Sequence, residues 1–349
     1  MLLQFGDACL KGISSVLPKE VRRPADMPDI SERDAKRLAR STGFEEFRVA
    51  GEGKTAADYC VVAAERLMED LHVAPDSLDA LVFISQSPDY IAPATSGILH
   101  HRLGLRRDAM VFDINHGCPG FVYGLFQASS LVHGGAERVL LCVGDTISRY
   151  ASPRDRSTYL VFGDGAAAAL VEAGEQSSAY SFYTDGSRFE ALGIRDGGMR
   201  HMFREESLVP HEDEQGNTHS DYQIHMDGAE IMTFSLEVVP GMIRDLLEGV
   251  SVPKEEIDLF ALHQANKLIV TSIGKKLGVP QDRVPFGAAK IGNTSLASIP
   301  LLLSSLYGDD ALAAEPCRKA VLCGFGVGLS AAAVYLSLEN TKIMRVVEI

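Results

Sequence analysis

The sequence predicts an α/β protein built from two similar halves. Apolar runs of strand length alternate with segments of helical periodicity along most of the 349 residues, a pattern typical of α/β architecture. Three blocks of the first half also recur in the same order in the second half, at a nearly constant offset of about 180 residues. These two observations favour a duplicated strand–helix unit over separate all-α and all-β regions.

The expected strands are short apolar runs bounded by polar or glycine-containing segments. They lie at 78–85, 109–114, 138–144, 166–173, 257–263, 319–325 and 330–338. Residues 55–71 predict a helix, because Thr55 and Asp58 have the spacing of a capping box. Cys60 and Leu67 then fall on one apolar face of that helix.

The internal repeat predicts how the halves are arranged. The matching blocks are 78–89 with 257–268, 116–130 with 291–305, and 137–145 with 318–326. Strand–glycine–helix segments resemble one another in many α/β proteins, which is the alternative explanation of the match. If the unit is duplicated, equivalent strand ends face one crevice, where α/β sheets bind ligands. We therefore expect one half at 1–174 and another at 226–349, joined by a polar, glycine-rich and irregular insertion at 175–225.

Composition excludes several classes of protein. Lys and Arg number 33 against 47 Asp and Glu, and the resulting net charge of −14 argues against nucleic-acid binding and against a basic membrane-binding surface. The six cysteines are scattered without a C-x-x-C pair, so neither a zinc site nor a disulfide scaffold is expected. The start has no signal-peptide pattern, and no apolar stretch is long enough to span a membrane. We expect a cytoplasmic protein without a membrane span.

Cys118 is the first candidate for chemistry. A predicted strand ends at Ile114, and Pro119 suits the first turn of the helix that follows. The free N–H groups and the dipole of a helix N-terminus favour a thiolate, the reactive form of cysteine. The alternative is a buried structural cysteine, the common fate of a free thiol.

Two further polar residues stand at equivalent places. His263 ends a predicted strand, and Asn293 lies in the block that repeats the one around Cys118. Taken alone, His263 is readily explained as a structural histidine, and Asn293 as a turn or N-cap residue. The repeat brings all three residues to one crevice, and a Cys, a His and an Asn together favour acyl transfer. The glycine-dense segment 324–328 allows close backbone approach to a ligand and offers N–H groups to an oxyanion.

These motifs resemble the thiolase superfamily, and within it the β-ketoacyl-acyl-carrier-protein synthase III family. The resemblance runs nearly end to end, with GCPGF around Cys118, HQAN from His263 and GNTS from 292 to 295 in the family's order. It implies two thiolase-like αβαβα halves in a five-layered sandwich and a homodimer. It also implies that Cys118 accepts the acyl group, that His263 and Asn293 hold the extender carbonyl, and that the N–H groups of Cys118 and Gly326 form an oxyanion hole.

The resemblance further implies the reaction. An acyl thioester primer is loaded on Cys118 and condensed with a malonyl thioester by decarboxylative Claisen condensation, in fatty acid or related secondary-metabolite biosynthesis. The expected partners are acyl-carrier protein, acyl-CoA or both, and no metal or redox cofactor is required.

Some residues expected at the substrate depart from the family pattern. Relatives clamp the adenine of coenzyme A with a tryptophan and an arginine, but this chain has no Trp and carries Arg37 and Ser41 at those positions. Arg156 matches another residue of the clamp, and Asn266 completes HQAN. Ala92 stands where relatives place a bulky aromatic that reaches the floor of the acyl pocket from the partner subunit, which predicts a longer or bulkier acyl group.

Docking of an acidic carrier protein requires a local basic patch on this acidic chain. Two sets of cations meet that need, although both also fit solvated helix faces. They are Lys267, Lys275 and Lys276 after HQAN, and Arg33, Lys36, Arg37 and Arg40 in the N-terminal segment.

Three other functions stay open. Cys323 precedes the glycine-dense segment where thiolases carry a second catalytic cysteine, although HQAN and GNTS fit the synthase pattern better. Relatives also transfer the acyl group from the cysteine to a different oxygen, nitrogen or carbon acceptor. The chain could also belong to a different functional class, as a partner subunit without catalytic activity. The intact set of Cys118, His263 and Asn293 argues against this alternative.

Overall fold

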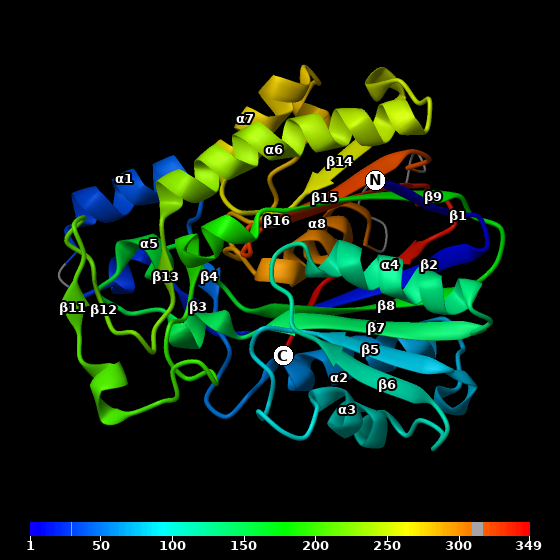
Figure 1. The fold of residues 1–349 in the computed structure, drawn as a ribbon, viewed down its shortest axis with the longest axis horizontal. Helices are drawn as coiled ribbons and strands as arrows, with labels where there is room; N and C mark the ends of the chain where they lie inside the picture. Colours follow the sequence, from blue (N-terminus) through cyan, green and yellow to red (C-terminus); the bar gives the residue numbers. More distant parts are fainter. Residues whose placement is uncertain (29, 309–316) are drawn as a thin grey trace.

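The computed structural model describes residues 1–28, 30–308 and 317–349. It has five layers, in which two β-sheets enclose a central pair of helices and carry further helices on their outer faces (Figure 1). The predicted fold class, with thiolase-like halves in a five-layered sandwich, is confirmed by this architecture.

The lower sheet of Figure 1 has the strand order β17–β2–β8–β7–β5–β6, and β18 also pairs with β2. β7, β5 and β6 are parallel, whereas β8 runs antiparallel to both β2 and β7. The strands are β2 (Ala8–Leu17), β5 (Ala80–Ile84), β6 (Met110–Ile114), β7 (Arg138–Asp145), β8 (Gly165–Ala173), β17 (Lys342–Ile343) and β18 (Val347–Glu348).

The upper sheet repeats this pattern. Its order is β1–β9–β16–β15–β14, with β16 antiparallel to β9 and β15 and with β15 parallel to β14. The run β9–β16–β15–β14 therefore matches β2–β8–β7–β5, which confirms the predicted duplication. The strands are β1 (Leu2–Phe5), β9 (Ser178–Thr184), β14 (Leu259–Leu262), β15 (Ala320–Gly326) and β16 (Ser330–Leu336).

The helices fill the remaining layers. α4 and α8 lie between the sheets, α6 and α7 cover the upper sheet, and α2 and α3 cover the lower one (Figure 1). The capped start predicted for α2 is present, since the backbone N–H of Thr55 donates to the Asp58 carboxylate at 2.9 Å. The helices are α1 (Glu32–Thr42), α2 (Ala56–Asp70), α3 (Thr95–Leu103), α4 (Gly120–His133), α5 (Arg156–Tyr159), α6 (Gly228–Gly249), α7 (Lys267–Leu277) and α8 (Ser298–Tyr307).

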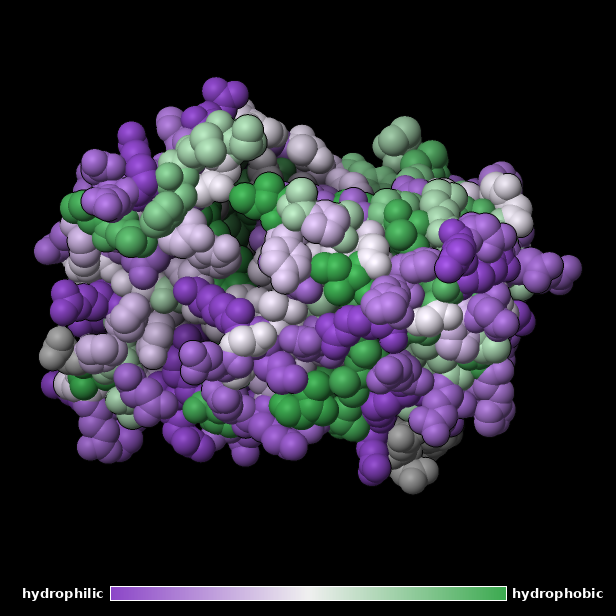
Figure 2. All heavy atoms as spheres, turned by 90° about the horizontal axis from the view of Figure 1, so that it is seen from below, coloured by the Kyte–Doolittle hydropathy of each residue, from purple (hydrophilic) through white to green (hydrophobic). Residues whose placement is uncertain are grey.

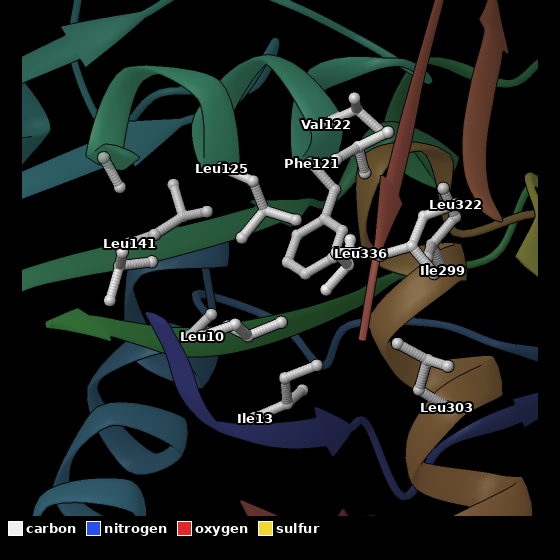
Figure 3. Packing of buried hydrophobic residues seen from close by; sticks show 14 of the residues in the cluster. Leu10, Ile13, Phe121, Val122, Leu125, Leu141, Ile299, Leu303, Leu322 and Leu336 are labelled. Carbon is white, nitrogen blue, oxygen red and sulfur yellow. The ribbon is translucent and has the colours of Figure 1, made fainter. Parts of the chain in front are cut away.

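The outer surface differs sharply from the interior. Seen from below, it is mostly hydrophilic, with several separate hydrophobic patches (Figure 2). The interior between the sheets is apolar, and Figure 3 shows Phe121 and Leu125 of α4 close to Leu336 of β16. All three side chains are buried. Burying each such side chain is worth about 1.5–3 kcal/mol, so this packing fixes the start of α4 relative to both sheets.

One segment differs from the prediction. The insertion expected to be irregular at 175–225 contains β9, which pairs with both β1 and β16. This strand is hard to recognise from its composition, because only its first three residues, Ser178, Ala179 and Tyr180, are buried, whereas Tyr183 near its end is exposed. The remainder of the insertion holds two short 3-10 helices, Gly186–Ala191 and Glu205–Leu208, and two-residue strand pairs. The pairs are β10 (Leu192–Gly193) with β13 (His225–Met226) and β11 (His211–Glu212) with β12 (Thr218–His219).

Each sheet also contains terminal strands from the opposite half of the chain. The N-terminal strand β1 joins the upper sheet, and the C-terminal strands β17 and β18 join the lower one.

Among the helices of the described ranges, none has the length and apolar composition of a membrane span. The same ranges contain no group of three or more His, Cys, Asp or Glu side chains placed to hold a metal ion.

Candidate active site

Cys118 lies between β6 and α4, in the turn that closes with the N–H of Gly120 donating to the carbonyl of Gly117 at 2.7 Å. The end of β15 packs directly against it. A Cβ on Gly326 would lie 2.9 Å from the Cys118 Sγ, and Gly326 has φ +152°. Only glycine fits here without strain, because it has no Cβ to clash. The backbone of the glycine-dense segment thus reaches the thiol, as the sequence predicts.

The protonation state of Cys118 differs from the prediction. The helix N-terminus was expected to favour a thiolate, but burial raises the pKa of the thiol to about 11. The backbone of Val327 and the hydroxyl of Ser295 act in the opposite direction by hydrogen bonding, with a smaller effect. Cys118 is only 5% exposed, and the free energy lost when a thiolate leaves water exceeds the stabilisation that these hydrogen bonds give it. The resting nucleophile is a protonated thiol.

His263 follows the last residue of β14. Its backbone N–H donates to the carbonyl of Cys323 at 2.8 Å, so β15 fixes the position of the residue. The ring Nδ1 pairs with the Ser298 hydroxyl at 2.7 Å. Burial lowers the pKa of the imidazole to about 3, and the ring is neutral near pH 7. A neutral imidazole with one nitrogen held by Ser298 suits hydrogen bonding to a substrate oxygen better than acid catalysis.

Asn293 is anchored through its backbone. Its N–H donates to the carbonyl of Val161 and its carbonyl accepts from the N–H of Gly163, both at 2.9 Å. The side-chain Oδ1 accepts from the N–H of Ser295 at 2.9 Å. That bond fixes the orientation of the amide, in which Nδ2 remains the donor group.

Ser295 lies beside two of the predicted residues. Its N–H donates to the Asn293 Oδ1 at 2.9 Å, and it lines the same cavity as Cys118. It has φ +51°, in the left-handed region that residues other than glycine adopt rarely. Ser295 thus neighbours Cys118 and Asn293, while His263 is held by Ser298 of the helix that follows, and Ser295 is a residue that the sequence interpretation missed.

A cavity of about 430 Å³ opens beside the nucleophile. Cys118, Ser295 and Val327 are among its lining residues. Its walls are largely apolar and include Ile147, Phe162, Leu192 and Ile224. A second cavity of about 610 Å³ shares Pro88, Tyr150 and Tyr222 with the first. The space is far larger than an acetyl group, since a water molecule occupies about 30 Å³ of liquid.

The predicted substrate-binding residues lie apart from this cavity. Arg156 is exposed at the start of α5. The pKa of Asp34 in α1 is lowered first by the hydrogen bond with the Ser31 hydroxyl, and Arg156 is one of the cations that lower it further. Asn266 caps α7, its Oδ1 accepting from the N–H of Ile269 at 2.8 Å. The observed contact of Asn266 is therefore structural.

Ala92 lines a different, smaller cavity of about 260 Å³. Its neighbour Ile91 lines both this cavity and the cavity at Cys118. Ile91 is 95% exposed, an unusual state for a large hydrophobic side chain. A role for Ala92 at the floor of the acyl pocket stays a prediction.

The predicted docking lysines lie on α7, and Lys267, Lys275 and Lys276 are all exposed. The ammonium of Lys276 donates to the carbonyl of Leu236 at 3.1 Å. α7 packs against α1, which carries the basic residues of the N-terminal segment. The two basic sets predicted from the sequence thus lie on neighbouring helices.

Cys323 is buried within β15. It belongs to the apolar cluster of the upper sheet together with Phe260 and Ala333. Burial raises the pKa of its thiol far above the usual value for cysteine. These surroundings favour the structural role over that of a second catalytic cysteine.

Known proteins share this architecture. Residues 112–186 match the family described as 3-oxoacyl-[acyl-carrier-protein (ACP)] synthase III, and residues 247–338 match the C-terminal domain of the same family. The chain is 33% identical to a beta-ketoacyl-[acyl-carrier-protein] synthase III of Gloeobacter violaceus, over 92% of this chain and 95% of that protein.

Two solved structures extend the comparison. A 3-oxoacyl-(acyl-carrier protein) synthase from Burkholderia xenovorans LB400 superposes with a TM-score of 0.93 and 33% identity, covering 100% of this chain and 99% of that one. The priming β-ketosynthase of the R1128 polyketide biosynthetic pathway superposes with a TM-score of 0.81 and 27% identity, covering 95% and 96% of the two chains.

Proposed function

The chain belongs to the 3-oxoacyl-[acyl-carrier-protein] synthase III family of condensing enzymes, and on that premise we propose that an acyl primer is loaded onto Cys118 and condensed with a malonyl thioester. One observation carries the proposal. The Cys118 thiol and Ser295 line one largely apolar cavity, the N–H of Ser295 binds Asn293, and His263 is held by Ser298 of the helix that follows. A nucleophile, a neutral imidazole and an amide donor are the groups that this reaction needs.

Primer loading is the first half-reaction. The Cys118 sulfur attacks the carbonyl carbon of the acyl thioester, the carbonyl π electrons move onto oxygen, and the carrier thiol leaves. The N–H groups of Cys118 and Gly326 receive the developing oxyanion. The approach of the Gly326 backbone to the Cys118 sulfur supports this role. Each well-placed donor of this kind is worth about 2.7–4 kcal/mol of transition-state stabilisation.

Condensation is the second half-reaction. The malonyl thioester loses CO2, and the electron pair of the broken C–C bond forms an enolate whose oxygen is held by His263 and Asn293. The enolate carbon then attacks the acyl group on Cys118, releasing the cysteine sulfur and a 3-oxoacyl thioester. Neutral donors suit this step, because a charged imidazole would protonate the carbanion. The side chains supply every group required, so the substrates are CoA or carrier-protein thioesters and no cofactor takes part.

The primer is proposed to be longer or bulkier than acetyl. The cavity beside Cys118 supports this, being about 430 Å³ with walls that include Phe162, Leu192 and Ile224. Arg37 and Ser41 replace the tryptophan and arginine with which relatives hold the adenine of coenzyme A. This favours a carrier protein, or CoA held in another way, as the donor.

Carrier-protein docking is proposed to use Lys267 together with the basic face of α1. Lys267→Glu is expected to raise KM for a carrier-bound malonyl thioester roughly tenfold, because steering of an acidic partner depends on local charge. With the malonyl-CoA thioester the change should be small. Steady-state kinetics at low and high salt make the comparison.

Lys342→Glu is the matched control for that variant. It changes the net charge equally but lies on β17, at the far edge of the lower sheet. The docking site would be contradicted if KM rose equally in both variants, or if it rose in neither of them.

A homodimer is proposed through the free edge of the lower sheet. β6 is the last strand in that sheet and begins at Met110, which is 51% exposed. Tyr90, Ile91 and Met199 are further large hydrophobic side chains left exposed. An open edge strand with apolar neighbours is a template for pairing with another chain.

Met110→Lys is expected to convert the dimer into a monomer at micromolar concentration, because a lysine on an edge strand opposes edge-to-edge pairing. Sedimentation equilibrium measures the mass directly. Leu268→Lys is the control, since Leu268 is a similarly exposed residue on α7. A dimer that survives Met110→Lys would sink the proposed interface.

Transfer of the acyl group to a different acceptor is the second candidate function. Similarity to a priming ketosynthase of a polyketide pathway favours keeping it, because that pathway is not primary fatty acid synthesis. A non-catalytic partner subunit is less favoured, since the thiol opens onto a cavity. Cytoplasmic location is also proposed, and all six cysteines are free.

Intact-protein mass spectrometry tests the proposal. The chain is incubated with a panel of acyl-CoA and acyl-carrier thioesters, and the mass gained identifies the primer. Release of labelled CO2 from a malonyl thioester then distinguishes condensation from transfer to another acceptor. No mass gain from any thioester would contradict the acyl-enzyme, and acylation without CO2 release would favour the second candidate.

A further inference from the structure

A half-buried arginine of the N-terminal segment is connected to the backbone of Asn293, and the two half-reactions above give it no role. Arg22 ends the short strand β3 (Val21–Arg22). Its guanidinium carbon lies 4.0 Å from the centre of the Tyr159 ring and 5.4 Å from that of the Phe47 ring. Among the described residues it has no ion-pair partner, and its Nε is buried without a hydrogen bond. A cation removed from water without a counter-ion is costly, so its presence points to a role beyond solubility.

One nitrogen of Arg22 makes two hydrogen bonds to the chain segment that leads to Gly163. Nη2 donates to the carbonyl of Tyr159 at 2.7 Å and to the carbonyl of Phe162 at 2.8 Å. The carbonyl of Phe162 and the N–H of Gly163 belong to the same planar peptide group. That N–H donates to the backbone carbonyl of Asn293 at 2.9 Å. A single rigid peptide group therefore connects the Arg22 guanidinium to the backbone of Asn293.

The Phe47 ring beside Arg22 also packs against the residue that precedes Asn293. A Cβ on Gly292 would lie 2.8 Å from Cδ1 of Phe47 and 3.1 Å from the backbone nitrogen of Gly163. Gly292 has φ +85°, so this close approach and this backbone conformation both require glycine. The backbone on the N-terminal side of Asn293 is thus packed against the same ring that the guanidinium covers.

We infer that Arg22 is a positioning residue for condensation, because it fixes the backbone of Asn293 and thereby the place of Nδ2, the donor to the enolate. The enolate as the partner of Nδ2 rests on the proposed function. Since the N–H of Ser295 holds Oδ1 of the same side chain, a displaced backbone would displace Nδ2 as well. The cation also polarises the peptide group between the two residues, and hydrogen bonds that share a polar group strengthen one another. Cys118 lies on another segment, between β6 and α4, so primer loading should not depend on Arg22.

Arg22→Met keeps an apolar side chain near the two rings but removes both hydrogen bonds. Release of labelled CO2 from a malonyl thioester should slow by roughly tenfold to a hundredfold, because small displacements of a positioned group have effects of that size. The loss should fall on kcat rather than on KM, as expected for a donor that acts mainly on the developing enolate. Loading of the primer on Cys118, followed by intact-protein mass spectrometry, should stay within a few-fold of wild type.

Arg22→Lys is the conservative variant. Because one nitrogen makes both bonds, a lysine ammonium with its three donors should restore most of the rate. Arg283→Met is the matched control, since Nη1 of Arg283 also donates to two backbone carbonyls, those of Glu255 and Ile257. These carbonyls precede β14, at the opposite end of that strand from His263. Arg283→Met should lower thermal stability but leave CO2 release unchanged. Should Arg22→Met fold poorly, Arg22→Gln replaces it, because its shorter, polar side chain cannot reach both carbonyls.

A second measurement does not depend on the reaction. In protein isotopically labelled at asparagine, nuclear magnetic resonance detects the side-chain amide of Asn293, which is assigned by its absence from Asn293→Ala. Arg22→Met should shift this signal, whereas Arg283→Met should not. A chain that releases no CO2 but shows the shift supports the positioning role and contradicts the proposed function. An unmoved signal, an equal loss of primer loading and CO2 release, or an equal effect of Arg283→Met overturns the inference.

Discussion

Replacing Cys118 with alanine is expected to lower the rate of condensation by roughly 10⁶-fold, the scale seen when a covalent nucleophile is removed. The variant has no sulfur to accept the primer, so no acyl-enzyme forms and the enolate has no electrophile. Release of labelled 3-oxoacyl product from acyl and malonyl thioesters measures the loss. Thermal unfolding should change little, because the alanine removes only one sulfur atom from the edge of a cavity.

Cys323→Ala is the matched control. Cys323 is also buried and also stands near the glycine-dense segment, but its side chain packs in the core of the upper sheet. Its removal should leave the rate within a few-fold of wild type and lower stability slightly. A large loss of condensation in Cys323→Ala would instead revive the two-cysteine chemistry of thiolases.

Replacing Asn293 with alanine is expected to lower the rate of condensation by about 10²–10³-fold, the effect of losing one oxyanion donor. Primer loading should survive, because the carbonyl of the primer is proposed to bind the N–H groups of Cys118 and Gly326. Single-turnover mass spectrometry separates the two half-reactions. We expect a variant that accumulates the acyl-enzyme and releases CO2 slowly.

His263→Ala provides the comparison. The same pattern, with loading retained and decarboxylation lost, is expected, because both donors serve the same enolate. Their combined effect should fall short of the product of the single effects, since groups that act as a unit are not additive. Loss of primer loading in either variant would show that the residue serves the first half-reaction instead.

Much of the fold could be read from periodicity. All seven expected strands are present, as are the helix start at Thr55 and the duplicated order of the sheets. These features depend on local pattern, which a sequence displays directly. β9 was not predicted, because only its first three residues are buried and its composition therefore resembles that of a loop. Its strand state depends on pairing with β1 and β16, which lie far away in the chain.

The site was predicted less completely than the fold. Cys118, His263 and Asn293 were found because each stands at a strand end or helix start. Ser295 was missed, since a serine beside such an end looks like an ordinary turn residue. The direction of the thiol pKa was wrong for a related reason: the sequence reveals the helix N-terminus but not how deeply the thiol is buried.

The exchange of terminal strands between the sheets makes the two halves inseparable. The first strand of the chain completes the sheet built by the second half, and the last strands complete the sheet built by the first. A fragment cut between the halves would lose an edge strand and expose the apolar face that α4 or α8 covers. Each sheet therefore needs strands from both halves, and the nucleophile from one half meets the imidazole and amide from the other only when both halves have folded together.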